Sequence, residues 1–265
     1  AMTKHAVIVD YIRTPFTKAY DPGSDSGKRG ALAHIRPDDM VAELIAGLLE
    51  RNAQVNPKDI ETVLTGCAFP EAEQGFNIAR IALMKAKLPD SVGGVTMNRF
   101  CGSSMHAIHD AAAHIAAGAG DVFLCTGVES MSRIPMGGWT PLPNPSLIAR
   151  RPEAYVSMGL TAENVADKFR ITRTAQDAFA LASHRKAEAA RLAGNFRHEI
   201  VPLFHAPHIR ADDNLRADST VEILAKLKPA FKMAGSVTAA TSSPITDGAS
   251  AVLVVFEDSA QTHGR

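Results

Sequence analysis

Cysteine is scarce in this sequence, with only three among 265 residues. Cys67, Cys101 and Cys125 form no CxxC pair, and such a sparse, odd count argues against a disulfide framework and a structural zinc site. No apolar run approaches the roughly 18 residues of a membrane-spanning helix, and no signal-peptide core follows the N-terminus. We therefore expect a cytoplasmic protein without a membrane span, in which any functional cysteine is a free thiol.

An excess of charge of one sign is also absent. Lys plus Arg and Asp plus Glu number 28 each, so no overall field attracts nucleic acid or an anionic membrane. Hydrophobic residues make up 46% and charged residues 21%, which is typical of a folded globular protein and excludes intrinsic disorder. We expect no nucleic-acid partner, and an anionic ligand would need a local binding patch.

Strand-like and helix-like segments alternate over the first 130 residues. In chain order, strand-like and helical patterns fall at 5–10, 38–49, 60–69, 77–88, 94–98, 103–117 and 121–126. Strands joined by crossovers of helical length predict an α/β fold with a mostly parallel sheet covered on both faces. The stretch 21–30, rich in Gly, Ser and Asp, predicts an exposed and mobile loop.

The character of the sequence changes after residue 130. Residues 131–155 are rich in Pro, Gly and Ser, which predicts a long functional loop. Helical patterns then cover 160–169, 174–193 and a segment that ends at 228–229, and 235–240 is strand-like. We expect the strongly apolar run 249–256 to return to the first sheet, so that the middle of the chain is an insertion.

Cys101 stands between a predicted strand and a predicted helix. We expect Gly102 to relieve crowding on this tight turn, and the free helix N–H groups and helix dipole to lower the pKa of the thiol. The Cys101 amide would also serve an oxyanion hole, as on a nucleophile elbow. A small buried side chain is the other common role of free cysteine, and the apolar settings of Cys67 and Cys125 favour that role.

Motifs spread over nearly the whole chain resemble those of thiolases. They are RTPF (13–16), NIAR (77–80), NRFCGSSM (98–105), GVESMS (127–132), MGLTAENVA (158–166), KLKPAF (226–231) and VTAATSSPITDGASAVLV (237–254). Their details resemble most closely the thiolase subunits of bacterial fatty-acid β-oxidation. The resemblance implies a five-stranded mixed sheet between helices, with an inserted, mostly helical loop domain. Mapped onto this chain, residues 1–130 plus 247–265 would form the α/β domain and 131–246 the CoA-binding loop domain.

The resemblance also implies a reaction. Family members cleave 3-ketoacyl-CoA with CoA to acetyl-CoA and a shortened acyl-CoA, or run the reverse condensation, through an acyl-enzyme on the cysteine that matches Cys101. Coenzyme A is then a co-substrate, and neither a permanently bound cofactor nor a metal is implied. His106 and His109 have a spacing that a metal could use, but no third ligand is obvious in the sequence.

Three further positions match CoA contacts of the family. Arg216 matches an arginine at the nucleotide end, Ser243 a serine that bonds the pantetheine chain, and Met158 a methionine that lines the pantetheine tunnel. By residue type alone, a loop arginine is usually solvated, a serine before proline shapes a turn, and a methionine fills core. The family further implies a homodimer, paired through strand 94–98, or a homotetramer, with or without a β-oxidation multienzyme subunit as partner.

Three motifs of the family do not occur in this sequence: an NEAF-type asparagine, a GHP histidine and a second cysteine in CxG. We therefore expect the chain to stop before the acid/base half, and these 265 residues to be nearly inactive alone, since acid–base help is worth about 10²–10⁴ in rate. Two alternatives stay open. One is a condensing enzyme of the β-ketoacyl synthase type, and the other is a non-catalytic, thiolase-like half subunit.

Overall fold

The computed structural model of the protein describes residues 4–19 and 30–262. The chain divides into two compact units. The first consists of Ala1–Trp139, Arg197–Asp213 and Ile245–Arg265, and the second of Thr140–Phe196 and Asn214–Pro244. The loop expected at 21–30 lies, apart from Gly30, outside the described residues. Within the described ranges, every helix is too short or too polar to cross a membrane.

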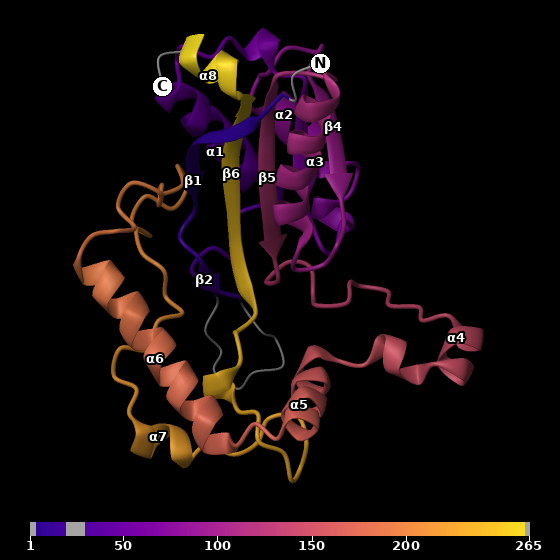
Figure 1. The fold of residues 1–265 in the computed structure, drawn as a ribbon, viewed down its shortest axis with the longest axis vertical. Helices are drawn as coiled ribbons and strands as arrows, with labels where there is room; N and C mark the ends of the chain where they lie inside the picture. The colour runs from indigo at the N-terminus through magenta and orange to yellow at the C-terminus, as the bar shows by residue number, and fades with distance from the viewer. Residues whose placement is uncertain (1–3, 20–29, 263–265) are drawn as a thin grey trace. The chain divides into compact units, whose positions relative to one another are not determined.

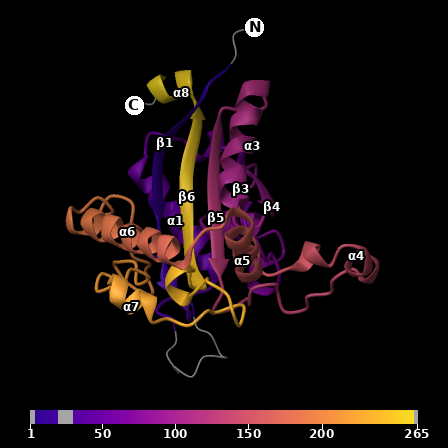
Figure 2. The same ribbon diagram turned by 60° about the horizontal axis from the view of Figure 1, so that its bottom comes forward.

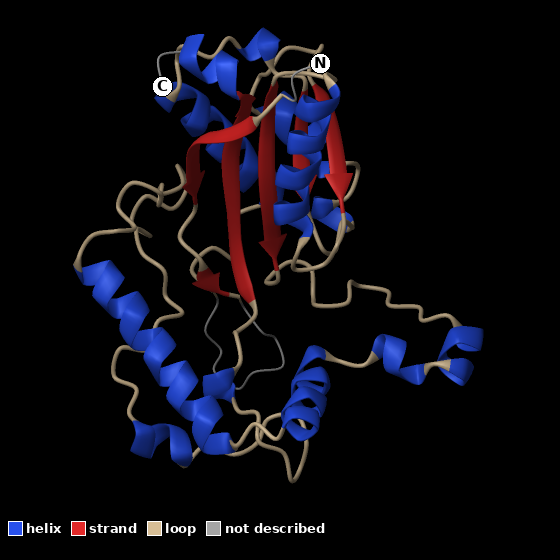
Figure 3. Cartoon of the chain, in the orientation of Figure 1, coloured by secondary structure: helices blue, strands red, loops and turns tan. Residues whose placement is uncertain are grey.

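A mixed β-sheet forms the centre of the first unit (Figures 1 and 3). The strands along the sheet are β1 (Ala6–Arg13), β6 (Thr246–Phe256), β5 (Val122–Ser130), β3 (Thr62–Gly66) and β4 (Gly93–Met97), and the two-residue β2 (Thr17–Lys18) also pairs with β6. Strand β3 runs parallel to β4 and β5, whereas β6 runs antiparallel to β1 and β5. The five-stranded mixed sheet is confirmed.

The prediction of a mostly parallel sheet, which followed from the alternating pattern, holds for the directions of β1, β3, β4 and β5, and β6 is the exception within the described sheet. A helical crossover brings a chain back in the same direction, and this holds for β3, β4 and β5. Strand β6 follows the second unit in the chain, not a crossover helix, and it inserts between β1 and β5 in the opposite direction. The apolar run at the end of the sequence thus closes the sheet as a central strand.

Helices cover both faces of this sheet. On one face α3 (Ser103–Ala117) packs against side chains such as Leu64 and Phe123, and Figure 2 shows it beside β3 and β5. The opposite face carries the larger core, to which α1 (Pro37–Arg51) and α2 (Ile78–Lys85) contribute. Helix α2 ends before the predicted position, because the backbone turns left-handed at Lys87 (φ 59°). A last helix, α8 (Glu257–Thr262), follows β6.

The second unit is mostly helical. Its helices are α4 (Pro145–Arg150), α5 (Met158–Phe169), α6 (Arg173–Leu192) and α7 (Val221–Ala225). Each begins after a residue whose side chain accepts a hydrogen bond from the first turn, and these N-caps are Asn144, Ser157, Thr172 and Thr220. Residues 131–155, expected as a long loop, contain α4 and a short 3₁₀ turn.

The strand expected at 235–240 does not form. The amides of Ser236 and Val237 donate to the buried carboxylate of Glu163 on α5, so they are not available to a β-ladder. Only an isolated bridge, between Pro229 and Thr238, and a 3₁₀ turn follow. A side chain distant in sequence thus overrides the local strand pattern.

The bounds of the units bear on the predicted domains. Segment 197–213, which lies within the predicted insertion 131–246, packs with the first unit. Arg13 on β1 holds it, with Nε donating to Glu199 at 2.7 Å and Nη1 to Asp212 at 2.7 Å. The amide of Phe16 also donates to Asp212. The assignment of the insertion as a CoA-binding domain stays a proposal.

Candidate active site

Cys101 lies on the turn between β4 and α3, and its side chain is exposed. The unusual backbone position of this turn is Phe100, which is left-handed with a φ of 47°. That conformation is uncommon for a bulky aromatic residue. Gly102 has an ordinary φ of −89°, so the expectation that this glycine relieves the crowding is wrong. The chain reverses one residue before the cysteine, and the strain therefore falls on Phe100.

Two side chains hold the left-handed residue in place. Asn98 Oδ1 accepts from the Phe100 amide at 2.8 Å. Ser103 Oγ accepts from the Arg99 amide at 2.8 Å and donates to the Phe100 carbonyl at 2.5 Å. Both are short polar side chains that bond nearby backbone in turns, so an asparagine and a serine flanking the cysteine were the available sequence signal.

The first amides of α3 are only partly free. Those of Gly102 and Ser103 donate to the carbonyls of Arg99 and Phe100, so they do not point at the sulfur as the sequence predicted. By contrast, the amides of Cys101, Ser104 and Met105 make no hydrogen bond within the described part of the chain. Unpaired N–H groups at a helix start attract negative charge, and this suits a thiolate or an oxyanion beside Cys101.

Two glycines let the start of α3 approach the sheet. A Cβ on Gly66, at the end of β3, would lie 2.7 Å from the Ser104 Cα. A Cβ on Gly127, in β5, would lie 2.5 Å from the Ser104 Cβ. Real side chains do not approach so closely, so both positions require glycine to set the depth of the first turn of α3.

The turn rests on a half-buried carboxylate, Glu129 of β5. It accepts from the amides of Ala68 at 2.8 Å and Phe69 at 3.3 Å, and from Gln74 Nε2 at 2.8 Å. Burial raises the pKa of Glu129, although these donors oppose that shift. Asn98 Nδ2 in turn donates to the Ala68 carbonyl at 2.9 Å. The Glu129 carboxylate thus holds the loop 68–69, to which Asn98 connects the cysteine turn.

The other two cysteines are buried. Burial, followed by the nearby Glu129 charge, raises the pKa of Cys67 to about 12. Burial and Asp110 raise the pKa of Cys125 to about 12 as well. Both thiols therefore stay protonated and shielded at neutral pH, whereas nucleophilic attack needs a thiolate.

The histidine that follows Cys101 most closely is already engaged. Arg99 Nη1 lies 3.2 Å from His106 Nδ1, and His106 Nε2 lies 3.6 Å from Asp110. His109 packs edge-on against His106. Over residues 4–19 and 30–262, no hydrogen bond joins a histidine to Cys101 and no group of three His, Cys, Asp or Glu is placed to hold a metal ion.

The positions predicted to bind CoA all lie in the second unit, whereas Cys101 belongs to the first. Met158 opens α5 and is 69% exposed, which does not fit a side chain that fills core. Arg216 and Ser243 are also exposed, and the Arg216 amide donates to His184 at 3.3 Å. Glu163 joins α5 to the segment that leads to Ser243.

Comparison with known proteins identifies the family. The N-terminal domain of thiolases matches residues 6–258. The chain belongs to the thiolase family. It is 48% identical over 259 residues to a 3-ketoacyl-CoA thiolase of Saccharophagus degradans, 45% over 265 residues to one of Pseudoalteromonas translucida and 43% over 271 residues to one of Vibrio vulnificus.

These thiolases are longer than this chain. The matches cover 95%, 97% and 98% of the chain, but only 64%, 66% and 67% of the respective relatives. The chain therefore spans about two thirds of the length of the thiolases it matches, in the region that the N-terminal domain describes.

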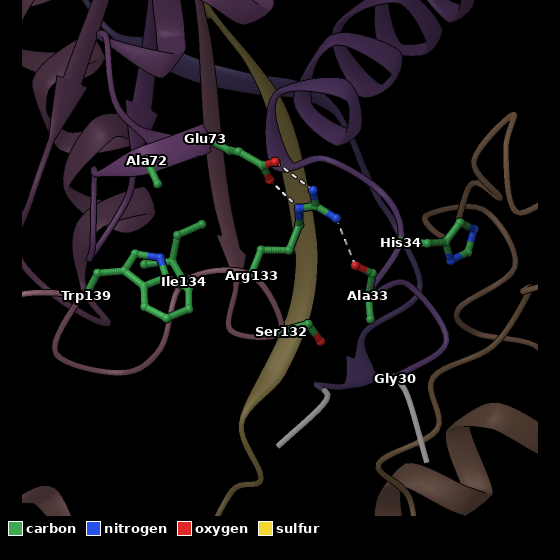
Figure 4. Close-up of a pocket in the computed structure, with 9 residues that line it drawn as sticks. All are labelled: Gly30, Ala33, His34, Ala72, Glu73, Ser132, Arg133, Ile134 and Trp139. Atoms are coloured by element: carbon green, nitrogen blue, oxygen red, sulfur yellow. Dashed lines mark hydrogen bonds and ion pairs between the residues drawn. The ribbon is translucent and has the colours of Figure 1, made fainter. Parts of the chain in front are cut away.

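A separate pocket of this thiolase chain lies in the first unit (Figure 4). Its walls include Glu73 and Arg133, whose carboxylate and guanidinium bond each other, and Arg133 also donates to the Ala33 carbonyl at 3.1 Å. Arg133 lowers the pKa of Glu73, so both groups are charged and paired. Cys101 is not among the lining residues, and we place the candidate active site at the cysteine turn.

Proposed function

We propose that this chain supplies the nucleophile of a 3-ketoacyl-CoA thiolase, and the exposed Cys101 on the strained β4–α3 turn carries the proposal. The Cys101 thiolate adds to the C3 carbonyl of a 3-ketoacyl-CoA. The C2–C3 bond then breaks, and its electron pair leaves with acetyl-CoA, whose C2 takes up a proton. A second CoA, as thiolate, attacks the acyl carbon on Cys101, and the cysteine thiolate departs. The names of the relatives support this substrate class.

The unpaired amides at the start of α3 suit this chemistry. The Cys101 amide, which has no acceptor among the described residues, is our candidate for an oxyanion donor. Such donors are most effective when they are fixed before the reaction. The seat of α3 on Gly66 and Gly127 supports that requirement.

In this proposal CoA binds the second unit through Arg216, Ser243 and Met158, as the family resemblance implies. Their exposure supports the assignment, because a nucleotide and a pantetheine chain need accessible side chains. CoA is then a co-substrate, and no permanently bound cofactor takes part. The role in β-oxidation, the cytoplasmic location and the homo-oligomer with or without a multienzyme partner belong to the same proposal.

Proton transfer is the step that these 265 residues do not supply in the proposed mechanism. The departing enolate needs an acid and the incoming CoA needs a base, and the three family motifs for these roles do not occur in the sequence. We therefore propose that the chain alone forms an acyl-enzyme but turns over about 10²–10⁴ times more slowly than a thiolase with those groups.

The test measures acyl-enzyme formation and turnover separately. The chain is incubated with an acyl-CoA, and mass spectrometry of its peptides locates the acyl group. Turnover is followed by loss of the Mg²⁺–enolate absorbance of 3-ketoacyl-CoA, for the chain alone and joined to the part of the Saccharophagus degradans thiolase that it does not match.

We expect acylation at Cys101 in both forms and full turnover only in the joined form. A Cys101→Ala variant should lose acylation and turnover but still bind CoA. Turnover that survives in this variant, or no acylation of Cys101 in either form, would overturn the proposal. CoA binding without acylation would favour the non-catalytic half subunit.

A further inference from the structure

Asn98 uses both ends of its side-chain amide at the cysteine turn. Its Oδ1 accepts from the Phe100 amide, two residues on, at 2.8 Å. Its Nδ2 donates to the Ala68 carbonyl at 2.9 Å, in the loop after β3. The side chain therefore connects the residue before Cys101 to a neighbouring strand end, and does not merely close a local turn.

The loop that Asn98 holds is fixed by buried groups. Glu129 accepts from the Ala68 amide at 2.8 Å, and Gln74, which is fully buried, donates both to Glu129 at 2.8 Å and to the Phe69 carbonyl at 2.9 Å. Gln74 Oε1 also accepts from the Ser130 amide at 2.8 Å. The Ala68 carbonyl thus offers Asn98 a fixed acceptor, because the amide of the same residue is bonded to Glu129 of β5.

Phe100 is the residue that needs such a connection. A left-handed aromatic residue is disfavoured, and a non-glycine residue persists in this region only when its surroundings hold it. Relaxation of Phe100 to an ordinary φ would turn the following peptide, and would displace the Cys101 side chain from its place just before α3.

We propose that Asn98 is a positioning residue for Cys101, with Glu129 as its anchor through Ala68. The inference rests on the proposed function, in which Cys101 is the nucleophile. Asn98 touches neither the sulfur nor the substrate in this role. It fixes the conformation of Phe100, and through Phe100 the place of the thiolate beside the helix start.

The experiment measures the rate at which iodoacetamide alkylates Cys101 as a function of pH, by peptide mapping, in the intact chain. Asn98→Ala should slow alkylation of Cys101 at pH 7.5 about tenfold, since the side chain loses its fixed place before α3. Glu129→Gln retains one acceptor oxygen and should give a smaller change of the same sign.

Asn56→Ala is the matched control. Asn56 Oδ1 accepts from the Lys58 amide at 3.1 Å, the same bond two residues on, in an exposed 3₁₀ turn. This variant removes the same kind of local bond far from Cys101 in the sequence and should leave the alkylation profile unchanged. A profile of Asn98→Ala that superposes on that of the unchanged chain would overturn the inference.

A second variant serves if Asn98→Ala does not fold. Glycine adopts a positive φ without strain, so in a Phe100→Gly background the removal of Asn98 should cost less than about threefold in rate. An equal cost in both backgrounds would contradict the role assigned to the strained residue. If Cys101 of the unchanged chain reacts no faster than in urea, the proposed function itself fails, which is a different result.

Discussion

At the scale of single residues, burial separates three chemically identical thiols. Cys67 and Cys125 are enclosed by the sheet and its helices, and their raised pKa values keep them neutral. Cys101 is the exposed one, at the start of a helix with unpaired amides. The distinction matters because only a thiolate reacts at a useful rate.

We predict that brief treatment with iodoacetamide at neutral pH labels Cys101 alone. Burial raises the pKa of Cys67 and of Cys125 to about 12, so their labelling in the folded chain should stay negligible through the neutral range. Peptide mapping by mass spectrometry measures each site, and labelling of all three cysteines in urea is the control. Equal labelling in the folded chain, or faster labelling of Cys67, would contradict the assignment of the nucleophile.

At the scale of elements, the position of α3 depends on two residues of the sheet that have no side chain. Gly66 and Gly127 leave room for the Ser104 backbone and side chain at the sheet surface. Helix α5 depends instead on a side chain that is present, because Glu163 binds the segment before the predicted CoA-binding serine. Each feature leads to a prediction.

We predict that Gly66→Ala destabilises the chain by about 1–3 kcal/mol and slows alkylation of Cys101, since the new methyl group meets backbone atoms of α3 that must move. The matched control is Gly47→Ala in α1, where the new Cβ would lie 3.5 Å from Ile12 Cδ1, an ordinary contact. That variant should be neutral or up to about 1 kcal/mol more stable. Urea denaturation and peptide mapping measure the two effects, and an unchanged Cys101 rate in Gly66→Ala would refute the proposed seat of α3.

We predict that Glu163→Gln destabilises the second unit by about 2 kcal/mol at pH 7, because the carboxylate accepts from Ser236 and Val237 and is 1% exposed. Burial alone would raise the pKa of Glu163, but these amides outweigh it and the pKa is lowered from 4.5. The stabilisation is therefore present above pH 4.5 and is lost as the pH falls through the lower folded-state value.

Denaturation at pH 7 and below pH 4 tests the sign of this effect, since the difference between the two proteins should narrow in acid. Glu188→Gln is the matched control on α6, where Glu188 forms an exposed ion pair with Arg191. It should change stability little at either pH. A Glu163→Gln effect that grows in acid would contradict the role of the carboxylate.

At the scale of the whole molecule, β4 lies at one edge of the described sheet. Its outward Gly94 carbonyl accepts from Asn77 Nδ2, so part of this edge is already covered by the chain itself. Val95 and Met84, however, are 46% and 47% exposed, and Phe76 is 91% exposed. Exposed apolar edges favour association, which supports the dimer proposed from the family resemblance.

We predict that the chain is at least a dimer at micromolar concentration, and that Val95→Lys shifts it towards the monomer by burying a charge in the contact. Light scattering with size-exclusion chromatography measures the mass. Ile8→Lys, on the opposite edge strand and 54% exposed in the unchanged chain, is the control and should leave the dimer intact. A stable monomer of the unchanged chain would contradict the proposed dimer.

The sequence by itself determined the features that depend on neighbouring residues. Helix α3 has the predicted bounds, because its apolar spacing is regular and Gly118 ends it in a left-handed conformation (φ 74°). The placement of Cys101 between a strand and this helix, and the burial of Cys67 and Cys125, followed from local pattern in the same way. The family motifs added the mixed sheet, which the alternation of elements alone did not predict.

The tertiary structure alone decided what depends on partners far apart in the chain. The direction of β6 is set by its pairing with β5, more than 100 residues earlier, and local periodicity carries no information about direction. Likewise, the segment 235–237 is kept out of a strand by its bonds to Glu163, and Phe100 is held left-handed in a turn that Asn98 ties to Ala68. In each case hydrogen bonds to residues distant in the sequence decide the conformation, and the local sequence pattern does not contain them.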